Sequence, residues 1–383
     1  MPLALPHLVA GFIAVLVGYT SSVVLIIQAA SAAGADAAQT ASWLWALGIG
    51  MGLSCIALSF YYRTPILTAW STPGAALLIT SLGQFTLAEA IGAFLISSLL
   101  ITLCGITGWF ERVMRQIPAS LATAMLAGIL LRFGLDLFKI TPQEPLLIGV
   151  LLLGFIAARH LWPRYTMVVV LAAGILLCGL RGQLQLSGLG WQLASPVWMS
   201  PGFSLDALFG IALPLFIVTM TSQNMPGIAI LRAHDYSVSS SSLIGWTGIL
   251  GAVLAPFGGF AFNLAAITAA ICMGKEVDQD PSRRWAAPVW AGGFYLLSGI
   301  FGATVVTLFN GFPPTLVTAI AGFALLGTIG NSLHAALQQD EEREAALLTF
   351  LITASGISLL GVGAACWGLL IGVTLHQVNR LRA

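Results

Sequence analysis

The sequence predicts an all-α polytopic membrane protein with about 14 transmembrane segments, arranged as two inverted repeats of seven. Three observations lead to this fold class. The 383 residues are 58% apolar and only 8% charged, whereas about 25% of residues are charged in soluble proteins. Apolar runs of the ~20 residues that a membrane-spanning helix needs cover the chain almost end to end. Similar stretches also recur roughly half a chain apart.

The apolar runs divide the chain into segments near 7–31, 42–61, 65–82, 87–109, 117–138, 145–160, 165–181, 204–231, 240–256, 258–274, 286–309, 313–336, 345–360 and 361–379. Segments 3 (65–82) and 10 (258–274) are expected to be short half-helices preceded by extended strands. In segment 3, Pro65 removes a backbone donor, and Pro73 with Gly74 starts a new helix after an extended piece. Backbone interrupted in this way is tolerated at membrane depth only where it is buried in protein or lines a cavity. We therefore predict a binding site at 69–74, the alternative being a merely kinked span.

The Lys and Arg residues set the predicted orientation, because cytoplasmic connections carry most of these charges. With the N-terminus inside, the outer side receives only Lys139 and Arg181, and Arg132 lies within segment 5. The inner side receives the others, which are Arg63, Arg112, Arg115, Arg159, Arg164, Arg232, Lys275, Arg283, Arg284, Arg343, Arg380 and Arg382. Both termini are therefore expected in the cytoplasm.

Three stretches recur in register between the two halves. IPASLATAMLAGILL (117–131) resembles FPPTLVTAIAGFALL (312–326), and GFIAVLVGYTSSVV (11–24) resembles GIALPLFIVTMTSQNM (210–225). The interrupted segment 3 has its counterpart in LAPFGGFAFNLAAITAAI (254–271). Because seven is an odd number of segments, the two halves insert with opposite orientations. Paired interrupted helices in inverted halves are typical of secondary transporters with a site near the membrane midplane.

Polar and aromatic residues gather where four of these segments should meet. The candidate site residues are Tyr19, Ser22, Trp70, Ser71, Thr72, Thr221, Ser222, Gln223, Asn224, Phe260, Phe262 and Asn263. These stretches contain no Asp, Glu, Lys or His, so the site is neutral. The N-terminal ends of two short helices favour a carboxylate or a similar anion, and Trp and Phe suit a flat apolar ring. The residues therefore predict a small anion with an aromatic body.

Other functional classes find less support. A net charge of +1 argues against a nucleic-acid partner. The chain lacks HExxH, GxSxG and any Cys–His cluster, so no enzyme, cofactor or metal is expected. Arg132 and Asp136 are four residues apart in segment 5 and can pair on one helix face, as a structural or a functional ion pair. A transporter of another solute, such as a nucleobase or an inorganic anion, and a passive anion channel stay open as alternatives.

Four stretches resemble the BenE family of bacterial benzoate transporters: RTPILTAWSTPGAALL (63–78), IPASLATAMLAGILLRFGL (117–135), LPLFIVTMTSQNMPGIA (213–229) and AAITAAIC (265–272). That family is similar to uracil and xanthine permeases and to sulfate/bicarbonate exchangers. The resemblance implies a core domain of segments 1–4 and 8–11 (1–116 and 203–310). It also implies a gate domain of segments 5–7 with the following connector and 12–14 (117–202 and 311–383).

The resemblance further implies proton-coupled benzoate import across the bacterial inner membrane and, by analogy with related folds, a homodimer. Nucleobase permeases carry a Glu in segment 8 that contacts the base, where this chain has Gln223 or its neighbour. This argues against a nucleobase and removes the obvious protonatable group. The substrate could carry the proton itself, because an aromatic carboxylic acid titrates near ~4 like Glu.

These arguments give each candidate residue an expected role. The carboxylate should be received by Ser71, Thr72, the N–H groups after them, and Asn263 with the half-helix of segment 10. Thr221, Gln223 and Asn224 should complete the polar wall, and Tyr19, Trp70, Phe260 and Phe262 should pack the ring.

Overall fold

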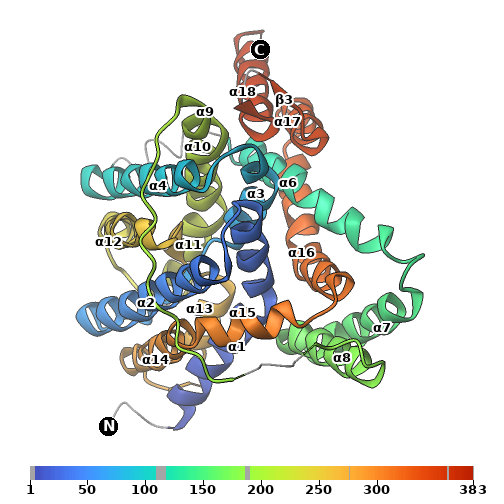
Figure 1. Ribbon diagram of the computed structural model, residues 1–383. Coiled ribbons are helices and arrows are strands. Elements are labelled where there is room, and N and C mark those ends of the chain that lie inside the picture. The colour runs from blue at the N-terminus through green and yellow to red at the C-terminus, as the bar shows by residue number, and fades with distance from the viewer. Residues whose placement is uncertain (1–4, 109–117, 186–189, 276, 360–361, 383) are drawn as a thin grey trace.

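The computed structural model describes residues 5–108, 118–185, 190–275, 277–359 and 362–382, and it is almost entirely helical (Figure 1). The longer helices are α1 (Leu5–Ala32), α2 (Ala37–Tyr62), α4 (Leu87–Thr107), α6 (Ala119–Lys139), α7 (Pro145–Leu161), α8 (Thr166–Leu180), α12 (Ser240–Leu254), α14 (Ala286–Ile300), α15 (Gly302–Asn310), α16 (Pro314–Leu337), α17 (Arg343–Ser355) and α18 (Ala364–Arg382). Helices α3 (Thr72–Ser81) and α13 (Ile267–Met273) are short. Residues 205–233 form one run, α9 (Leu205–Ala207), η3 (Leu208–Ala212), α10 (Leu213–Thr219), η4 (Met220–Asn224) and α11 (Met225–Ala233), in which η3 and η4 are π-helical.

The predicted helical class is confirmed. By length and composition, six helices of the described chain could cross a membrane, or up to eight if each of two bent pairs forms one span. The count of 14 transmembrane segments stays a prediction, as does the membrane depth of α3 and α13. The predicted boundaries at 109, 117, 360 and 361 lie outside the described residues, as do Arg112 and Arg115.

Two helix pairs, α2 with α14 and α4 with α12, build one side of the molecule, at the left of Figure 1. Glycines allow each pair to approach closely, because a Cβ on Gly48 of α2 would collide with the backbone of Gly299 at the end of α14. A Cβ on Gly105 of α4 would likewise collide with Gly245 of α12. Close contact between small residues is how helices associate in membranes. The predicted repeats relate α2 to α12 and α4 to α14. Exchanging the repeats therefore converts the α2–α14 pair into the α12–α4 pair, which agrees with the repeats found in the sequence.

Two short strands cross between these helix pairs. Strand β1 (Thr68–Trp70) pairs antiparallel with β2 (Phe262–Leu264), with Ala69 opposite Asn263. The hydroxyl of Thr68 fixes β1 to α2, since it lies 2.6 Å from the Ser54 hydroxyl and donates to the Met51 carbonyl. Each strand leads directly into a short helix, β1 into α3 and β2 into α13. The extended pieces predicted before both short helices are therefore present and pair with each other.

A second group, at the right and top of Figure 1, consists of α6, α7, α8, α16, α17 and α18. There α6 packs against α16 and α17, α7 against α8, and α17 against α18. Strands β3 (Ser358–Leu359) and β4 (Val362–Gly363) form a hairpin before α18. Helices α1 and α3 lie between the two groups, because α1 contacts both α14 and α16, and α3 contacts α1 and α6.

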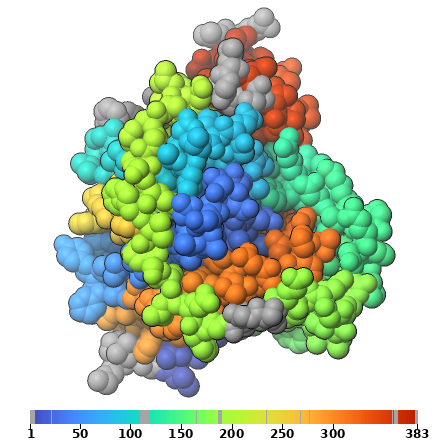
Figure 2. Space-filling view, viewed as in Figure 1, coloured from blue at the N-terminus to red at the C-terminus, as the bar shows by residue number. Residues whose placement is uncertain are grey.

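The connector between the two halves lies along the first group of helices. Backbone N–H groups of Ala194, Met199 and Gly202 donate to carbonyls of Ile300, Pro256 and Ala88 at 2.7–2.8 Å. In Figure 2 this yellow-green segment runs over one face of the molecule. The sequence analysis assigns this connector to the gate domain, and that division of the chain stays a prediction; residues 194–202 lie against helices of the predicted core domain.

The predicted ion pair between Arg132 and Asp136 does not form. The Asp136 carboxylate instead accepts a hydrogen bond from Lys139, three residues further along α6, with an Nζ–Oδ1 distance of 2.9 Å. A guanidinium nitrogen of Arg132 donates to the carbonyl of Ser355 at the end of α17, at 3.2 Å. Lys139 is three residues from Asp136, and its flexible side chain reaches the carboxylate. Arg132 instead bonds the C-terminal end of α17, because the last carbonyls of a helix have no partner within the helix.

Replacing Gly48 with alanine should destabilise the protein by about 1–2 kcal/mol, because overpacking of a tight contact forces backbone shifts. The added Cβ would lie 2.6 Å from the Gly299 nitrogen and 2.8 Å from the Tyr295 carbonyl oxygen, and neither can move alone. Thermal unfolding of purified protein in detergent measures the effect. Gly154→Ala on α7 is the matched control, since a Cβ there meets nothing within 4 Å. Equal melting temperatures in both variants would show that this glycine contact is not required.

Candidate binding site

A cavity of about 500 Å³ lies where the two groups of helices face each other. One wall comes from α1, β1 and the start of α3, η4, the start of α13 and Tyr295 of α14, and the other from α6 and α16. Its size is in the range of small-molecule sites, roughly 300–1,000 Å³. Six of the predicted site residues line it, namely Ser22, Trp70, Thr72, Thr221, Ser222 and Gln223.

The π-helical turn η4 shapes one side of the cavity. The backbone N–H of Met225 donates to the carbonyl of Met220, five residues back. An α-helix closes the same hydrogen bond over four residues, so this turn contains one additional residue. Pro226 follows immediately and has no N–H to offer to the preceding turn. Bulges of this kind frequently lie at functional sites. The result is that Thr221, Ser222, Gln223 and Pro226 all line the cavity.

Trp70 of β1 connects the strand to the first helix. Its indole Nε1–H donates to the Ser22 hydroxyl at 2.7 Å, and Ser22 in turn donates to the Gly18 carbonyl of α1 at 2.8 Å. The Trp70 side chain is 4% exposed, yet the residue lines the cavity. These two bonds hold the flat indole ring in a fixed position at the cavity wall.

The hydroxyl groups of the cavity differ in what they can still donate. Thr221 donates to the Ile217 carbonyl at 2.7 Å, and Ser222 donates to the Val218 carbonyl. Since a hydroxyl has only one hydrogen, these two can only accept from a ligand. Gln223 and Thr72 form no side-chain hydrogen bond with any described residue, so their donors are open to the cavity.

Helix α3 begins at this cavity. Ser71 caps it, accepting the Gly74 N–H at 3.0 Å, and Pro73 occupies the first turn. Ser71 is fully buried and outside the cavity lining, and in this structure it positions the start of the helix; its predicted contact with the carboxylate stays a prediction. Its neighbour Thr72 lines the cavity at the positive end of the α3 dipole.

Two predicted polar residues lie behind the cavity wall, in the protein interior. The Oδ1 atom of Asn224 accepts the backbone N–H of Leu264 at 3.0 Å, which ties η4 to strand β2. Asn263 is fully buried, and its amide donates to the Ala261 carbonyl at 2.9 Å. These amides satisfy backbone groups of the strand crossing, and neither is among the residues that line the cavity.

Three predicted aromatic residues also lie outside the cavity lining. Phe260 packs against Trp43 and Phe94, with ring centroids 5.8 and 5.1 Å apart, in the core between α2 and α4. Phe262 is 1% exposed and lies against Gly50 of α2 and Gly251 of α12. The Tyr19 ring on α1 packs against the Trp70 ring in a tilted arrangement, with centroids 5.1 Å apart. In this structure the three rings pack inside the protein, and their predicted contact with a ligand stays a prediction.

The second wall of the cavity was missed by the sequence analysis. It is formed by Thr123 of α6 and by Thr328, Asn331 and Ser332 of α16, and Tyr295 and Thr268 complete the first wall. Thr328, Asn331 and Ser332 follow a spacing of three and four, which places them on one face of a helix. This polar stripe in an apolar segment was a usable signal in the sequence.

The cavity is electrically neutral. None of its lining residues is Asp, Glu, Lys, Arg or His. The described residues also contain no group of three or more His, Cys, Asp or Glu that could hold a metal ion. The arrangement can therefore bind a ligand through neutral donors, aromatic faces and a helix dipole.

Comparisons with known proteins show the family of this chain. The chain matches the family model "Benzoate membrane transport protein" (BenE) over residues 1–378. It is 48% identical to the inner membrane protein YdcO of Escherichia coli K12 over 378 residues, covering 99% of this chain and 97% of that protein. It is 39% identical over 370 residues to the benzoate membrane transport protein of Acinetobacter baylyi, covering 97% of this chain and 94% of that protein.

Solved structures show the same fold at low sequence identity. The anion transporter SLC26A9 aligns with a TM-score of 0.66 and 14% identity, over 98% of this chain and 65% of that one. The transmembrane domain of the cyanobacterial bicarbonate transporter BicA aligns with a TM-score of 0.63 and 15% identity, over 92% of this chain and 98% of that one. The chain belongs to the BenE family of benzoate membrane transport proteins, and it is a membrane transporter and not an enzyme.

Proposed function

We propose that this protein is a secondary active transporter that imports a small aromatic carboxylate such as benzoate, together with protons. Transport proceeds by alternating access in the bacterial inner membrane, with both termini in the cytoplasm. The core domain (1–116 and 203–310) moves against the gate domain (117–202 and 311–383), apart from the connector residues 194–202, which travel with the core. A homodimer is proposed by analogy with related folds, and the mass of the detergent-solubilised protein tests it.

The neutral cavity at the interface of the two groups of helices is the observation that carries this proposal. A site between two bodies can open to either side as one body moves against the other. Its open donors, Thr72 and Gln223, suit the carboxylate, and the α3 dipole favours the negative charge. The fixed Trp70 ring suits the aromatic body.

Proton coupling requires a group that binds a proton, and in our proposal the substrate supplies it. The lining residues include no carboxylate, histidine or lysine. A benzoic acid carboxyl group titrates near ~4, like that of Glu. Once protonated it becomes a donor, and the oxygens of Thr221 and Ser222 are then suitable acceptors, because their own hydrogens are already given to backbone carbonyls.

Benzoate should stabilise the purified protein, whereas uracil and sulfate should not. A ligand that binds only the folded state adds roughly 2.7 kcal/mol at a hundred times its Kd. Thermal unfolding in detergent measures this for the three ligands side by side. Stabilisation by uracil or sulfate in place of benzoate would retain the fold and overturn the substrate.

Uptake then separates a transporter from a passive channel. Benzoic acid crosses lipid in its neutral form, so proteoliposome uptake is compared with empty vesicles at pH 8. We expect saturable uptake that increases with an inward proton gradient. Uptake that neither saturates nor responds to the gradient would indicate a channel.

A further inference from the structure

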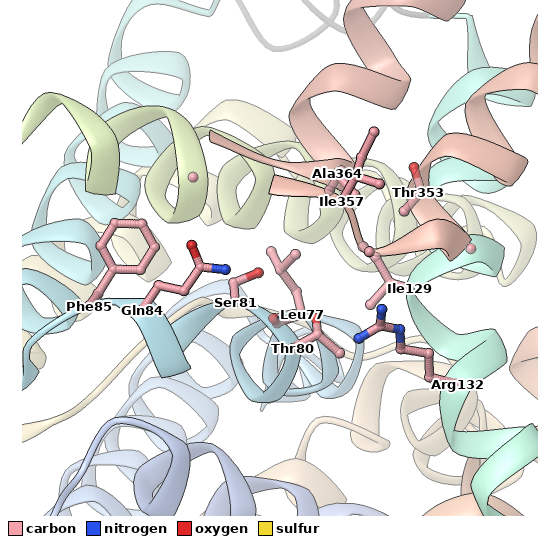
Figure 3. A pocket seen from close by; sticks show the side chains of 14 residues that line it. Leu77, Thr80, Ser81, Gln84, Phe85, Ile129, Arg132, Thr353, Ile357 and Ala364 are labelled. Carbon is pink, nitrogen blue, oxygen red and sulfur yellow. Dashed lines mark hydrogen bonds between the residues drawn. The ribbon is translucent and has the colours of Figure 1, made fainter. Parts of the chain in front are cut away.

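A second, smaller pocket of about 50 Å³ lies at the same helix interface as the main cavity. One side comes from the end of α3 and the turn after it, with Thr80, Ser81 and Gln84, and the other from α6, α17 and the start of α18. In Figure 3 the Arg132 guanidinium points from α6 into this space, across from Ser81 and Gln84. This pocket contains a fixed positive charge, which the main cavity lacks.

Within the part of the chain that the structure describes, no acidic side chain pairs with Arg132. Asp136, one turn away, is engaged by Lys139 at 2.9 Å. Among the described residues, Arg132 makes one hydrogen bond, to the Ser355 carbonyl at 3.2 Å, although a guanidinium has five N–H donors. Gly356, with φ of 65°, leaves room for the guanidinium beside it. An Arg within an apolar helix is costly and is a functional candidate for that reason.

A second polar group, the hydroxyl of Thr353, also lies at this pocket. Thr353 of α17 lines the pocket and is 5% exposed, and its buried hydroxyl has no hydrogen-bond partner among the described residues. A buried polar group without a partner costs stability. An anion with accompanying water could satisfy both Thr353 and the remaining donors of Arg132.

The two pockets follow the same pair of helices. On α6 the main cavity reaches Leu126 and the small pocket begins at Gly128 and includes Arg132. Six residues of helix span about 9 Å. On α3 the main cavity is lined by Pro73 and the small pocket by Leu77 and Ser81. Along the axis of α6, the two pockets are therefore about two helical turns apart.

We propose that the Arg132 pocket is a second anion site, which receives the carboxylate of the substrate before it enters the main cavity. A single water needs roughly 10–15 Å³ of such volume, so the pocket holds a carboxylate group while the aromatic ring stays at its open mouth. The orientation predicted from the Lys and Arg residues places it on the outer side. This inference rests on the proposed function, since it assigns the entry step of the same substrate.

Replacing Arg132 with glutamine should raise the KM of benzoate uptake about five- to tenfold and leave kcat within twofold. The reason is that a charge lining an entry path raises the local concentration of an oppositely charged substrate, by tenfold or more in favourable cases. Uptake by the unmodified protein should fall as salt increases, and this dependence should be lost in Arg132→Gln. Right-side-out proteoliposomes at pH 8, corrected for empty vesicles, provide both measurements.

Two further variants separate recruitment of the anion from support of the fold. Arg181→Gln removes the same charge from another helix end, where Arg181 pairs with Glu144, and should leave KM and salt dependence unchanged. Arg132→Lys keeps the charge and should retain most of the uptake. Equal losses in Arg132→Lys and Arg132→Gln, with lowered melting temperatures in both, would reduce Arg132 to a cap of α17 and overturn the inference.

The remaining outcomes distinguish this inference from the proposed function. Normal KM and salt dependence in Arg132→Gln would overturn the second site while leaving benzoate transport intact. Absence of benzoate uptake by the unmodified protein would overturn the proposed function, and the entry site with it.

Discussion

Replacing Gln223 with leucine is expected to weaken benzoate binding by about 1–3 kcal/mol, the usual effect of removing one hydrogen-bond partner at a buried polar group. That range corresponds to roughly 5- to 150-fold in Kd. The melting temperature of the ligand-free protein should change little, because Gln223 bonds no described residue. Calorimetry on the detergent-purified variant measures Kd, and thermal unfolding without ligand provides the stability control.

Gln223→Glu is the matched variant, with the same shape and a carboxylate that titrates near ~4.3 when unperturbed. Above that pH its negative charge should repel benzoate, so the loss of affinity should at least equal that of Gln223→Leu. As the pH falls and the carboxyl group binds a proton, affinity should recover relative to the unmodified protein. Unchanged Kd in both variants would remove Gln223 from the binding site.

The fold was predictable because its determinants are local. Apolar runs mark the helices, and Pro65, Pro73 and Gly258 mark the places where helix cannot continue. Gly258 adopts φ of 88°, a left-handed conformation that favours glycine. From these residues alone, extended pieces could be expected before both short helices, and the structure joins them as β1 and β2.

The candidate site was predictable only in part, because the direction of each side chain depends on contacts far away in the sequence. Successive side chains of a strand point to opposite faces, and no local pattern showed that Phe262 faces α2 and α12. The π-helical turn shifts the helical register by one residue, so Gln223 lines the cavity while Asn224 turns toward β2. Residues of α16 join the site only through packing of the two halves.

The Arg132–Asp136 prediction failed for a similar reason. The spacing of four allows the pair, but Lys139 at a spacing of three competes for the same carboxylate. Arg132 bonds the carbonyl of Ser355 instead, which is 223 residues away in the chain. Long-range packing decided between two local possibilities.

Replacing Asn224 with alanine should lower the stability of the ligand-free protein by about 3 kcal/mol, near the upper end for leaving a buried group unpaired. The Leu264 N–H points away from β1, and the Asn224 amide oxygen accepts it at 3.0 Å, as a third strand would. Among the residues that the structure describes, no other acceptor bonds the Leu264 N–H, and both residues are buried. Thermal unfolding in detergent measures the loss, and benzoate affinity should fall as a consequence of the displaced strand.

Asn310→Ala is the control for this change, since it removes the same amide from an exposed position at the end of α15, outside the cavity lining, and should alter stability by less than about 0.5 kcal/mol. The comparison decides between two roles for Asn224. A lower melting temperature with a proportionate loss of affinity means that the amide holds β2 in place, and that the site depends on the strand crossing behind it. An unchanged melting temperature with a large rise in Kd would mean that Asn224 contacts the ligand directly. That contact would require η4 to rotate, so that the Asn224 side chain enters the cavity when substrate binds.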